Sequence, residues 1–179
     1  HRARLLVKQY PDSGYAWKVL GALIKQMGRS LDALGPMQKA AALSPSDAEA
    51  HHNLGITLHE LGRLKEAEVS CRRALQLKPD WAEVHYNFGI VLTGLGRLEE
   101  AEVSYRQALA FKPDFAEAHG NLGIILRDLG RLDEAEVSYR RALEIKPDYA
   151  EVHNSLGITL RDLGRLDEAG ASHRRALEI

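Results

Sequence analysis

The stretch RLDEAEVSYRRALEIKPDYAEVHNSLG, residues 131–157, decides the fold. It is rich in good helix formers but is interrupted in the middle by Pro147 and Asp148. Proline has no backbone N–H and disfavours helical geometry in the residue before it, so we expect a helix to end near Ile145. Asp148 followed by Glu151 has the spacing of a capping box, which predicts that a second helix begins at once. The segment therefore predicts two helices joined by a tight turn.

The same interruption recurs with a period of 34 residues along the whole chain. Four series of identical residues keep this step: Pro11, Pro45, Pro79, Pro113 and Pro147; Gly21, Gly55, Gly89, Gly123 and Gly157; Gly28, Gly62, Gly96, Gly130 and Gly164; Ala33, Ala67, Ala101, Ala135 and Ala169. A fixed period between 20 and 50 residues indicates supersecondary units that stack on their neighbours. The sequence is therefore an array of repeats.

Each unit is predicted to be a helical hairpin. Leucines and alanines spaced three and four residues apart mark one apolar face in residues 50–61 and another in residues 64–75. Gly62 stands between them, where a left-handed residue after a helix is needed. Gly55, Ala67 and Ala74 are small, which allows the two backbones to approach closely. Neither helix could bury its apolar face alone.

These residues resemble the tetratricopeptide repeat family, and the resemblance covers essentially the whole chain. The family pattern of Leu-Gly, Ala, a large residue, Ala and Pro is matched in the second unit by Leu54, Gly55, Leu58, Ala67, Cys71, Ala74 and Pro79. The resemblance implies an all-α fold, a right-handed superhelical α-solenoid of antiparallel helix pairs. The predicted boundaries are a partial repeat over residues 1–13, a divergent repeat 14–47, then 48–81, 82–115, 116–149 and a truncated repeat 150–179.

A finer resemblance concerns the start of each first helix. The aromatic usual in the family is kept at Trp17, and histidines stand at 51, 85, 119 and 153. Together with asparagine at 53, 87 and 121, this substitution is similar to the arrays of O-linked N-acetylglucosamine transferases and their bacterial relatives. The resemblance implies that a transferase domain accompanies the array. Both ends cut through the repeat pattern, which predicts a fragment of a longer protein.

Composition sets further limits. With 179 residues, 45 % hydrophobic residues and a net charge of −1, the chain can bury a continuous core of stacked layers. No apolar run approaches the length of a membrane span. The one cysteine, Cys71, cannot form an internal disulfide, and its place on an apolar face predicts a packed, inert thiol. These features favour a cytoplasmic protein that does not bind a membrane.

No constellation with catalytic or metal-binding chemistry stands out, so we predict a protein that is not an enzyme and needs no cofactor. Histidines one period apart lie on successive hairpins, roughly 10 Å apart, whereas zinc ligands must each lie about 2 Å from the metal. Serines at 70, 104, 138 and 172 recur four times, which indicates a solvated helix face, since a nucleophile site is built once. Acidic pairs at the starts of second helices and arginine pairs near their ends fit the helix dipole.

The remaining polar residues lie on the first-helix face that lines the concave groove in this family. The candidate peptide-binding residues are Glu49, His52, Asn53, Ile56, His59, Glu83, Tyr86, Asn87, Ile90, Glu117, Asn121, Ile124, Arg127, Glu151, Asn154, Ile158 and Arg161. Asn53, Asn87 and Asn121 form a ladder, and an amide both donates to and accepts from an extended backbone. We therefore predict a module that binds a protein or peptide segment; the alternative is that asparagine merely tolerates a polar surface.

The sequence bears on three other classes of partner. A clamp for chaperone tails needs a set of lysines, arginine and asparagines of which only Lys18 and Asn53 are present. RNA binding requires a basic groove, and a sequence pI near 6.8 opposes it, so no nucleic acid is expected. End-to-end self-association through exposed apolar ends remains an alternative.

One local departure predicts an irregular helix. Gly35 and Pro36 stand inside the second helix of the first complete repeat, where sister repeats carry Val and Ser. Proline should bend that helix or delay its start.

Overall fold

The computed structural model describes residues 2–179, which form eleven α-helices and no strand. The all-helical prediction is therefore confirmed. The helices are α1 Arg2–Gln9, α2 Gly14–Gln26, α3 Ser30–Leu43, α4 Ala48–Glu60, α5 Leu64–Leu77, α6 Ala82–Gly94, α7 Leu98–Phe111, α8 Ala116–Asp128, α9 Leu132–Ile145, α10 Ala150–Asp162 and α11 Leu166–Glu178. Within residues 2–179, no helix has both the length and the apolar character that crossing a membrane requires.

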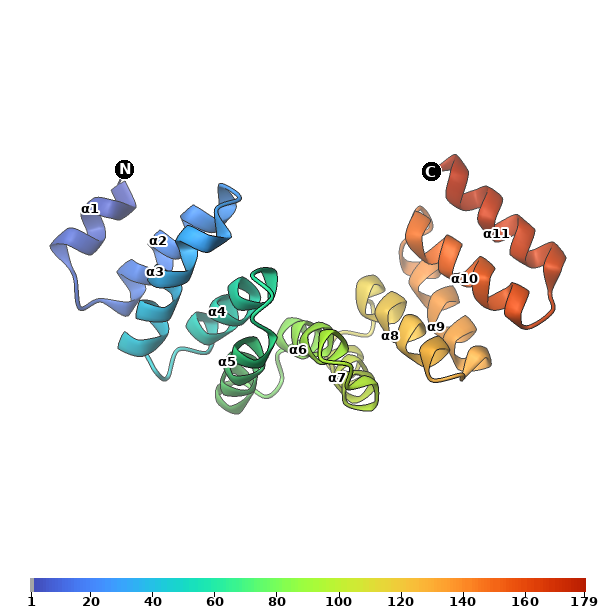
Figure 1. Cartoon of the computed structure of the whole chain (residues 1–179), viewed down its shortest axis with the longest axis horizontal. Helices are drawn as coiled ribbons and strands as arrows, with labels where there is room; N and C mark the ends of the chain where they lie inside the picture. Colours follow the sequence, from blue (N-terminus) through green and yellow to red (C-terminus); the bar gives the residue numbers. More distant parts are fainter. Residues whose placement is uncertain (1) are drawn as a thin grey trace. The chain divides into compact units, whose positions relative to one another are not determined.

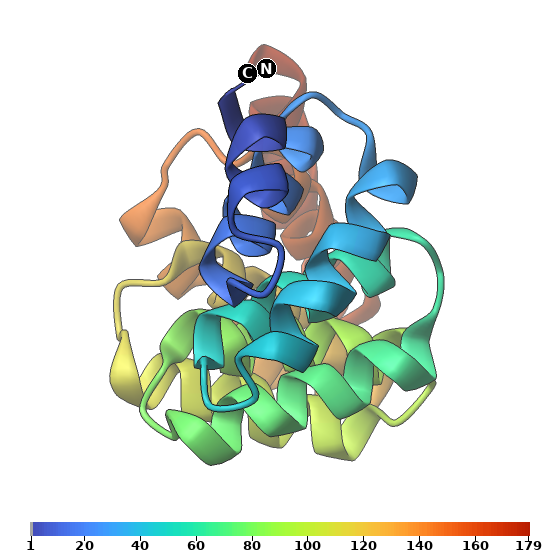
Figure 2. The same cartoon turned by 90° about the vertical axis from the view of Figure 1, so that its left-hand side faces the viewer.

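The chain divides into two compact units, His1–Leu95 and Gly96–Ile179. Unit 1 holds α1 to α6, and unit 2 holds α7 to α11 (Figure 1). In unit 1, α2 packs against α3 and α4 against α5; in unit 2, α8 packs against α9 and α10 against α11. The chain reverses direction at alternate ends of these helices (Figure 2). Each unit is thus a stack of antiparallel helix pairs.

The glycine turns inside the hairpins have the geometry that the sequence predicted. Gly62 has a φ of +72°, which is left-handed. Its N–H donates to the His59 carbonyl at 2.9 Å, and the Arg63 N–H donates to the Leu58 carbonyl at 2.9 Å. These two bonds define a Schellman motif, which satisfies carbonyls at the end of α4. The same pair of bonds follows α8 at Gly130, so the turn is a property of the repeat.

Close approach of the two helices explains the second glycine series. A Cβ built on Gly55 would lie 3.0 Å from the Cys71 sulfur, and one on Gly123 would lie 2.6 Å from the Tyr139 ring. Cys71 is fully buried, and burial raises the pKa of its thiol to about 12. The interpretation of Cys71 as a packed, inert thiol agrees with this position.

The predicted capping box after Pro147 is wrong. Helix α10 has Tyr149 at its N-cap position, without a side-chain cap, and Asp148 lies in the turn before it. The aspartate is one residue too early for its carboxylate to reach the free N–H groups of the first turn. Asp47 stands at the N-cap of α4, and its carboxylate accepts from the Glu49 and Ala50 N–H groups.

The predicted late start of the helix with Pro36 is also wrong. Helix α3 begins at Ser30 and has 14 residues, the same length as α5. The N–H that Pro36 lacks would have bonded to the carbonyl of Asp32, which lies in the exposed first turn, where water can hydrate that carbonyl. A bend in α3 stays a prediction.

Candidate functional site

The candidate residues lie on the first helices of the hairpins, on α4 and α6 in unit 1 and on α8 and α10 in unit 2. Because their spacing follows the helical period, each helix presents its set on one face. Most of these side chains are partly exposed, whereas His52 is buried. The two units are described one after the other.

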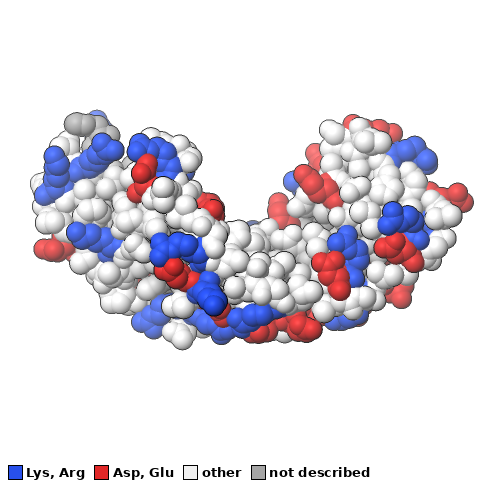
Figure 3. All heavy atoms as spheres, viewed as in Figure 1, with Lys and Arg blue, Asp and Glu red and all other residues white. Residues whose placement is uncertain are grey.

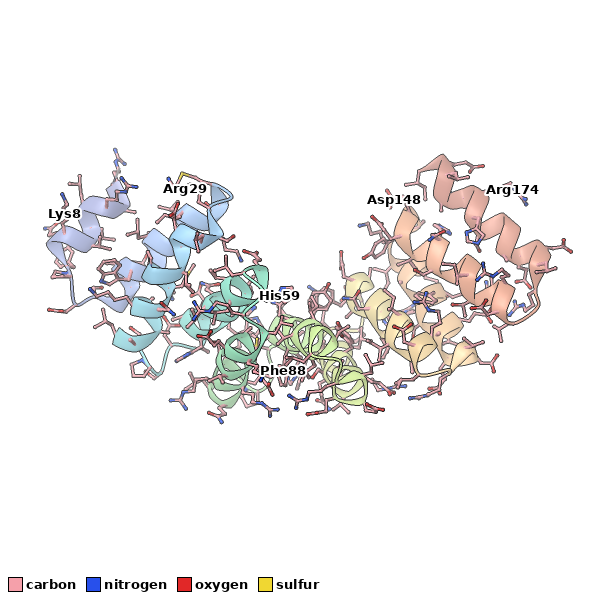
Figure 4. The ribbon with its side chains drawn as sticks, viewed as in Figure 1. Lys8, Arg29, His59, Phe88, Asp148 and Arg174 are labelled. Atoms are coloured by element: carbon pink, nitrogen blue, oxygen red, sulfur yellow. The ribbon has the colours of Figure 1, made fainter. Side chains whose placement is uncertain are left out.

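In unit 1 the structure brings four candidate residues to one small cavity between α4 and α6. The cavity has a volume of about 20 Å³, and Ile56 and His59 reach it from α4, while Asn87 and Ile90 reach it from α6. In Figure 4, His59 is labelled at the last turn of α4, and Phe88 is labelled lower, towards α5. A space of about 10–15 Å³ holds one water molecule, so the cavity can accept a water or a methyl group.

His52 is the most constrained candidate residue. Its side chain is 8 % exposed, and its ring packs edge-on against Trp81 with the centroids 4.8 Å apart. The Asn87 amide lies 2.7 Å from His52 Nε2, which accepts the bond when the imidazole is neutral. Burial lowers the pKa of His52 to about 4, and the nearby Lys25 charge adds to the effect. His52 is therefore neutral at pH 7 and links two successive first helices.

Glu49 is engaged by an ion pair between first helices. Lys18 of α2 contacts the Glu49 carboxylate at 2.7 Å and the Asp47 carboxylate at 2.8 Å. Lys18, the lysine considered for a chaperone-tail clamp, therefore already serves to tie α2 to the start of α4. The structure describes no hydrogen bond for the Asn53 side chain within residues 2–179, so its amide is available to a ligand.

In unit 2 a tyrosine fills the space that Cys71 leaves open in unit 1. Tyr139 is fully buried beside Gly123, and its hydroxyl is the one buried side-chain polar atom within residues 2–179 without a well-aligned hydrogen bond, although the nearby Ser155 hydroxyl acts to lower its pKa. Burial raises the pKa of this hydroxyl to about 12. Cys71 and Tyr139 thus occupy the same position beside the first-helix glycine with side chains of different size.

The arginines and Asn154 of unit 2 make local contacts. Arg127 pairs with Asp128 at 3.0 Å, and Arg161 pairs with Asp162 at 3.2 Å. Asn154 Oδ1 lies 3.1 Å from a ring nitrogen of His173 on α11, which is donating there. These pairs are exposed, and each leaves part of the polar group accessible to a ligand.

The histidines at a step of 34 residues make a hydrogen bond that the sequence did not predict. The Nε2 atom of His51 lies 3.2 Å from the Pro45 carbonyl, and His85, His119 and His153 repeat this contact with their own prolines at 2.7, 3.0 and 2.8 Å. Trp17 Nε1 donates to the Pro11 carbonyl at 2.7 Å in the same way. A carbonyl only accepts, so each histidine must carry its proton on Nε2. The shared feature is a ring N–H that closes the turn.

The turn between repeats carries a second unpredicted contact. The ammonium of Lys78 lies 4.6 Å from the centre of the Trp81 ring, within the range of a cation–π interaction. Lys112 with Phe115 and Lys146 with Tyr149 repeat it at 4.6 and 4.4 Å. The signal was present in the sequence as Lys-Pro-Asp followed by an aromatic residue.

The charges of the second helices form closed rings of ion pairs. Glu102 of α7 accepts from Arg106 and from Arg131. Glu134 of α9 accepts from the same two arginines. Glu136, Arg140, Arg165 and Glu168 form the same ring one period later. These charges therefore connect successive repeats, in addition to complementing the helix dipoles.

A stack of helix hairpins with a 34-residue period, left-handed glycine turns and a polar first-helix face defines a helical-repeat protein of the protein-interaction class. The family model described as tetratricopeptide repeat matches residues 46–114 and again residues 114–179. The chain belongs to the tetratricopeptide repeat family. Proteins of this family bind other proteins or peptides and are generally non-catalytic scaffolds.

Solved structures agree with this assignment. The structure of MamA has 25 % sequence identity and a TM-score of 0.82 over 88 % of this chain and 92 % of that chain. A thermophilic tetratricopeptide repeat protein in Thermus thermophilus has 27 % identity and a TM-score of 0.73 over 93 % and 91 %. YrrB, described as having an unusual peptide-binding site, has 21 % identity and a TM-score of 0.81 over 99 % and 92 %. No curated protein matches closely enough to count as a relative.

Proposed function

We propose that the first-helix face binds an extended segment of a partner protein, without catalysis by this chain. The observation that carries the proposal is the convergence of Ile56, His59, Asn87 and Ile90 on one cavity between two successive repeats. A side-chain methyl of the partner fits that cavity, and the Asn53 amide can bond the partner's backbone. The peptide-binding site named for YrrB supports the proposal by analogy of fold.

The ladder of asparagines is not uniform in this proposal. The Asn87 amide donates to His52, so it is held in place and can offer its oxygen to a ligand. Asn53 keeps both its donor and its acceptor for the partner. Unit 2 has proposed peptide-binding residues of its own, which are Asn121, Ile124, Arg127, Ile158 and Arg161. The divergence of these residues between repeats suits recognition of a specific side-chain sequence.

The transferase context belongs to the same proposal. The asparagine ladder supports a relation to the arrays of O-linked N-acetylglucosamine transferases. The direct test is the reading frame that flanks this sequence, which would contain a glycosyltransferase domain. An adjacent domain of another kind would remove this part of the proposal and leave peptide binding untouched.

The binding test begins with a displayed library of random peptides selected against the purified chain. Affinities of the selected peptides are then measured for Asn53→Ala, Asn121→Ala and the control Lys65→Gln, which lies on α5 outside the first-helix face. Loss of one hydrogen bond should weaken binding by about 0.5–1.5 kcal/mol, or roughly 2- to 13-fold. Unchanged affinity in both asparagine variants would show that these asparagines do not contribute to peptide binding.

Salt dependence separates peptide recognition from the RNA alternative. Backbone recognition should change little between two salt concentrations, whereas RNA binding falls steeply as salt rises. Single-stranded RNA is titrated in parallel under both conditions. Tight, salt-sensitive RNA binding that depends on Asn53 would replace the peptide proposal.

A further inference from the structure

The two units carry matching hollows on the side of their second helices, away from the proposed peptide-binding face. In unit 1 a hollow of about 600 Å³ lies between α3 and α5, with α4 as its floor; Ala41, His51, Leu54, Val69, Arg72 and Arg73 line it. In unit 2 a hollow of about 670 Å³ lies between α7 and α9 over α8; Leu109, His119, Leu122, Val137, Arg140 and Arg141 line it.

The correspondence between the two hollows is position by position. Each of these six residues of unit 1 has its counterpart 68 residues later, which is two repeat periods. A chance gap between side chains would not recur in this register. The hollow is therefore built by the repeat itself, from the second helices and the His-Pro turn.

The lining of the hollow in unit 1 combines apolar and cationic groups. Leu54 and Ala41 form an apolar interior, and Val69 stands at the edge with 67 % of its surface exposed. Val137, its counterpart in unit 2, is 69 % exposed. Each exposed valine extends the apolar lining of its hollow to the surface, where a partner's side chain can reach it.

The charge at this hollow is positive in unit 1. Arg72 and Arg73 line it, and no acidic residue does. Arg72 is paired with Glu68, but Arg73 bonds only to neutral groups, the Gln76 amide oxygen and the Pro45 carbonyl, both at 3.3 Å or less. Figure 3 shows Lys and Arg side chains along the edge of unit 1 where Figure 1 places α5. The cation of Arg73 therefore has no carboxylate partner within residues 2–179.

In unit 2 the same position is neutralised. Glu144 replaces Gln76 and pairs with Arg141 at 2.7 Å. The two hollows thus share their apolar floor but differ at two charged positions. Glu144 of unit 2 stands where unit 1 has Gln76, and Arg106, which pairs with Glu102 and Glu134, stands where unit 1 has Gln38. The first difference supplies a natural comparison for the role of the Arg73 charge.

We propose that the hollow of unit 1 docks an acidic amphipathic helix of a partner protein. The apolar side chains of that helix would enter the space beside Val69 and Leu54, and its carboxylates would pair with Arg73 and Arg72. The partner is helical because the walls are helices, whose backbone groups are already bonded and cannot pair with an extended strand. A nucleic acid is disfavoured because the lining holds no Phe, Tyr or Trp on which bases could stack.

The test uses a fluorescein-labelled peptide of about 15 residues, long enough to form a helix, with leucines on one face and glutamates beside them. A companion peptide carries lysine in place of every glutamate. Binding is followed by fluorescence anisotropy for the unaltered chain, Arg73→Gln, Val69→Glu and Gln76→Glu. The controls are Lys65→Gln, which removes the same charge elsewhere on α5, and Asn53→Ala on the first-helix face.

The acidic peptide should bind and the lysine peptide should not. Arg73→Gln should weaken binding about fivefold, the effect of one exposed ion pair. Gln76→Glu, which copies unit 2 and leaves Arg73 in place, should do the same, and Val69→Glu should weaken binding about tenfold or more. Lys65→Gln and Asn53→Ala should bind as the unaltered chain does. Circular dichroism checks that each variant remains helical.

Four results would overturn the proposal. Equal binding of both peptides would show that charge does not select the partner. Weaker binding in Asn53→Ala would show that the peptide binds the first-helix face. Unchanged affinity in Arg73→Gln and Gln76→Glu would show that the peptide does not bind in the hollow. Displacement of the peptide by single-stranded RNA in an Arg73-dependent manner would assign the charge to nucleic acid. None of these outcomes bears on the proposed peptide-binding face except the dependence on Asn53, which would support it.

Discussion

Acidification should destabilise unit 1 through His52. Burial, followed by the Lys25 charge, lowers the pKa of His52 from its ordinary 6.5 to about 4 in the folded chain. Between pH 6.5 and pH 4, His52 binds a proton in the unfolded chain but not in the folded chain. The contribution of neutral His52 to the free energy of unfolding is therefore complete above pH 6.5. It is lost progressively as pH falls towards 4.

The size of the effect follows from the difference between the two pKa values. A gap of about 2.5 pH units corresponds to about 3 kcal/mol of unfolding free energy, since one pH unit is worth about 1.36 kcal/mol. At pH 5 about 2 kcal/mol of this should be lost relative to pH 8. The side chain is only 8 % exposed, so solvent screening is small. Protonation at Nε2 also abolishes the bond that Asn87 donates.

Urea unfolding at pH 8 and pH 5, followed by circular dichroism, measures this loss. The free energy of unfolding of His52→Gln should fall less between the two pH values than that of the unaltered chain, by about 2 kcal/mol. Glutamine can still accept from Asn87, and Asn154 occupies the equivalent position in the last repeat, so the variant should fold. His59→Gln, on the same helix, is the control. Equal pH dependence in the unaltered chain and in His52→Gln would refute the reasoning.

Three further predictions concern unit 2 and are measured by urea unfolding at pH 7.5. Gly123→Ala should destabilise by about 1–3 kcal/mol, because its Cβ would lie 2.6 Å from the Tyr139 ring; Gly170→Ala, with 3.4 Å to its nearest neighbour, should not. Tyr139→Phe should leave stability unchanged or raise it by up to about 1 kcal/mol, since the hydroxyl it removes has no well-aligned hydrogen bond within residues 2–179. His119→Phe should cost about 1 kcal/mol, because the Pro113 carbonyl loses its donor; stability equal to that of the unaltered chain would contradict this.

The fold could be predicted from the sequence because its signals are local. A left-handed glycine such as Gly62 and a helix end before Pro147 depend on residues a few places away. The capping box failed by one position. Helix α10 has Tyr149 at its N-cap, the counterpart of Asp47 in α4, so Asp148 lies one residue before the position from which Asp47 caps its helix. A difference of one residue in where a helix begins decides whether a carboxylate reaches the free N–H groups of the first turn.

The candidate site was predictable as a face but not as a set of contacts. Helical spacing places Asn53 and Ile56 on one side of α4, and this needs no knowledge of other repeats. The bond between Asn87 and His52 joins residues 35 positions apart, and the cavity beside it is lined by Cys71, where unit 2 has the larger Tyr139. Such features depend on the packing of two repeats that differ in sequence. The repeat period predicts which positions of neighbouring helices are in contact. Only the structure shows how the different residues at those positions pack.

The histidines that close the turns between repeats give less support to the resemblance to transferase arrays than the sequence suggested. Replacement of Trp17 by histidine in the later repeats suggested transferase arrays, but both side chains donate a ring N–H to a proline carbonyl. A residue whose ring N–H closes the turn between repeats serves the fold, whatever the array binds. The histidine series therefore carries structural information, and the proposed relation rests on the asparagines. Of these, Asn87 is bonded to His52, so Asn53 is the position at which recognition can be tested without disturbing the stack.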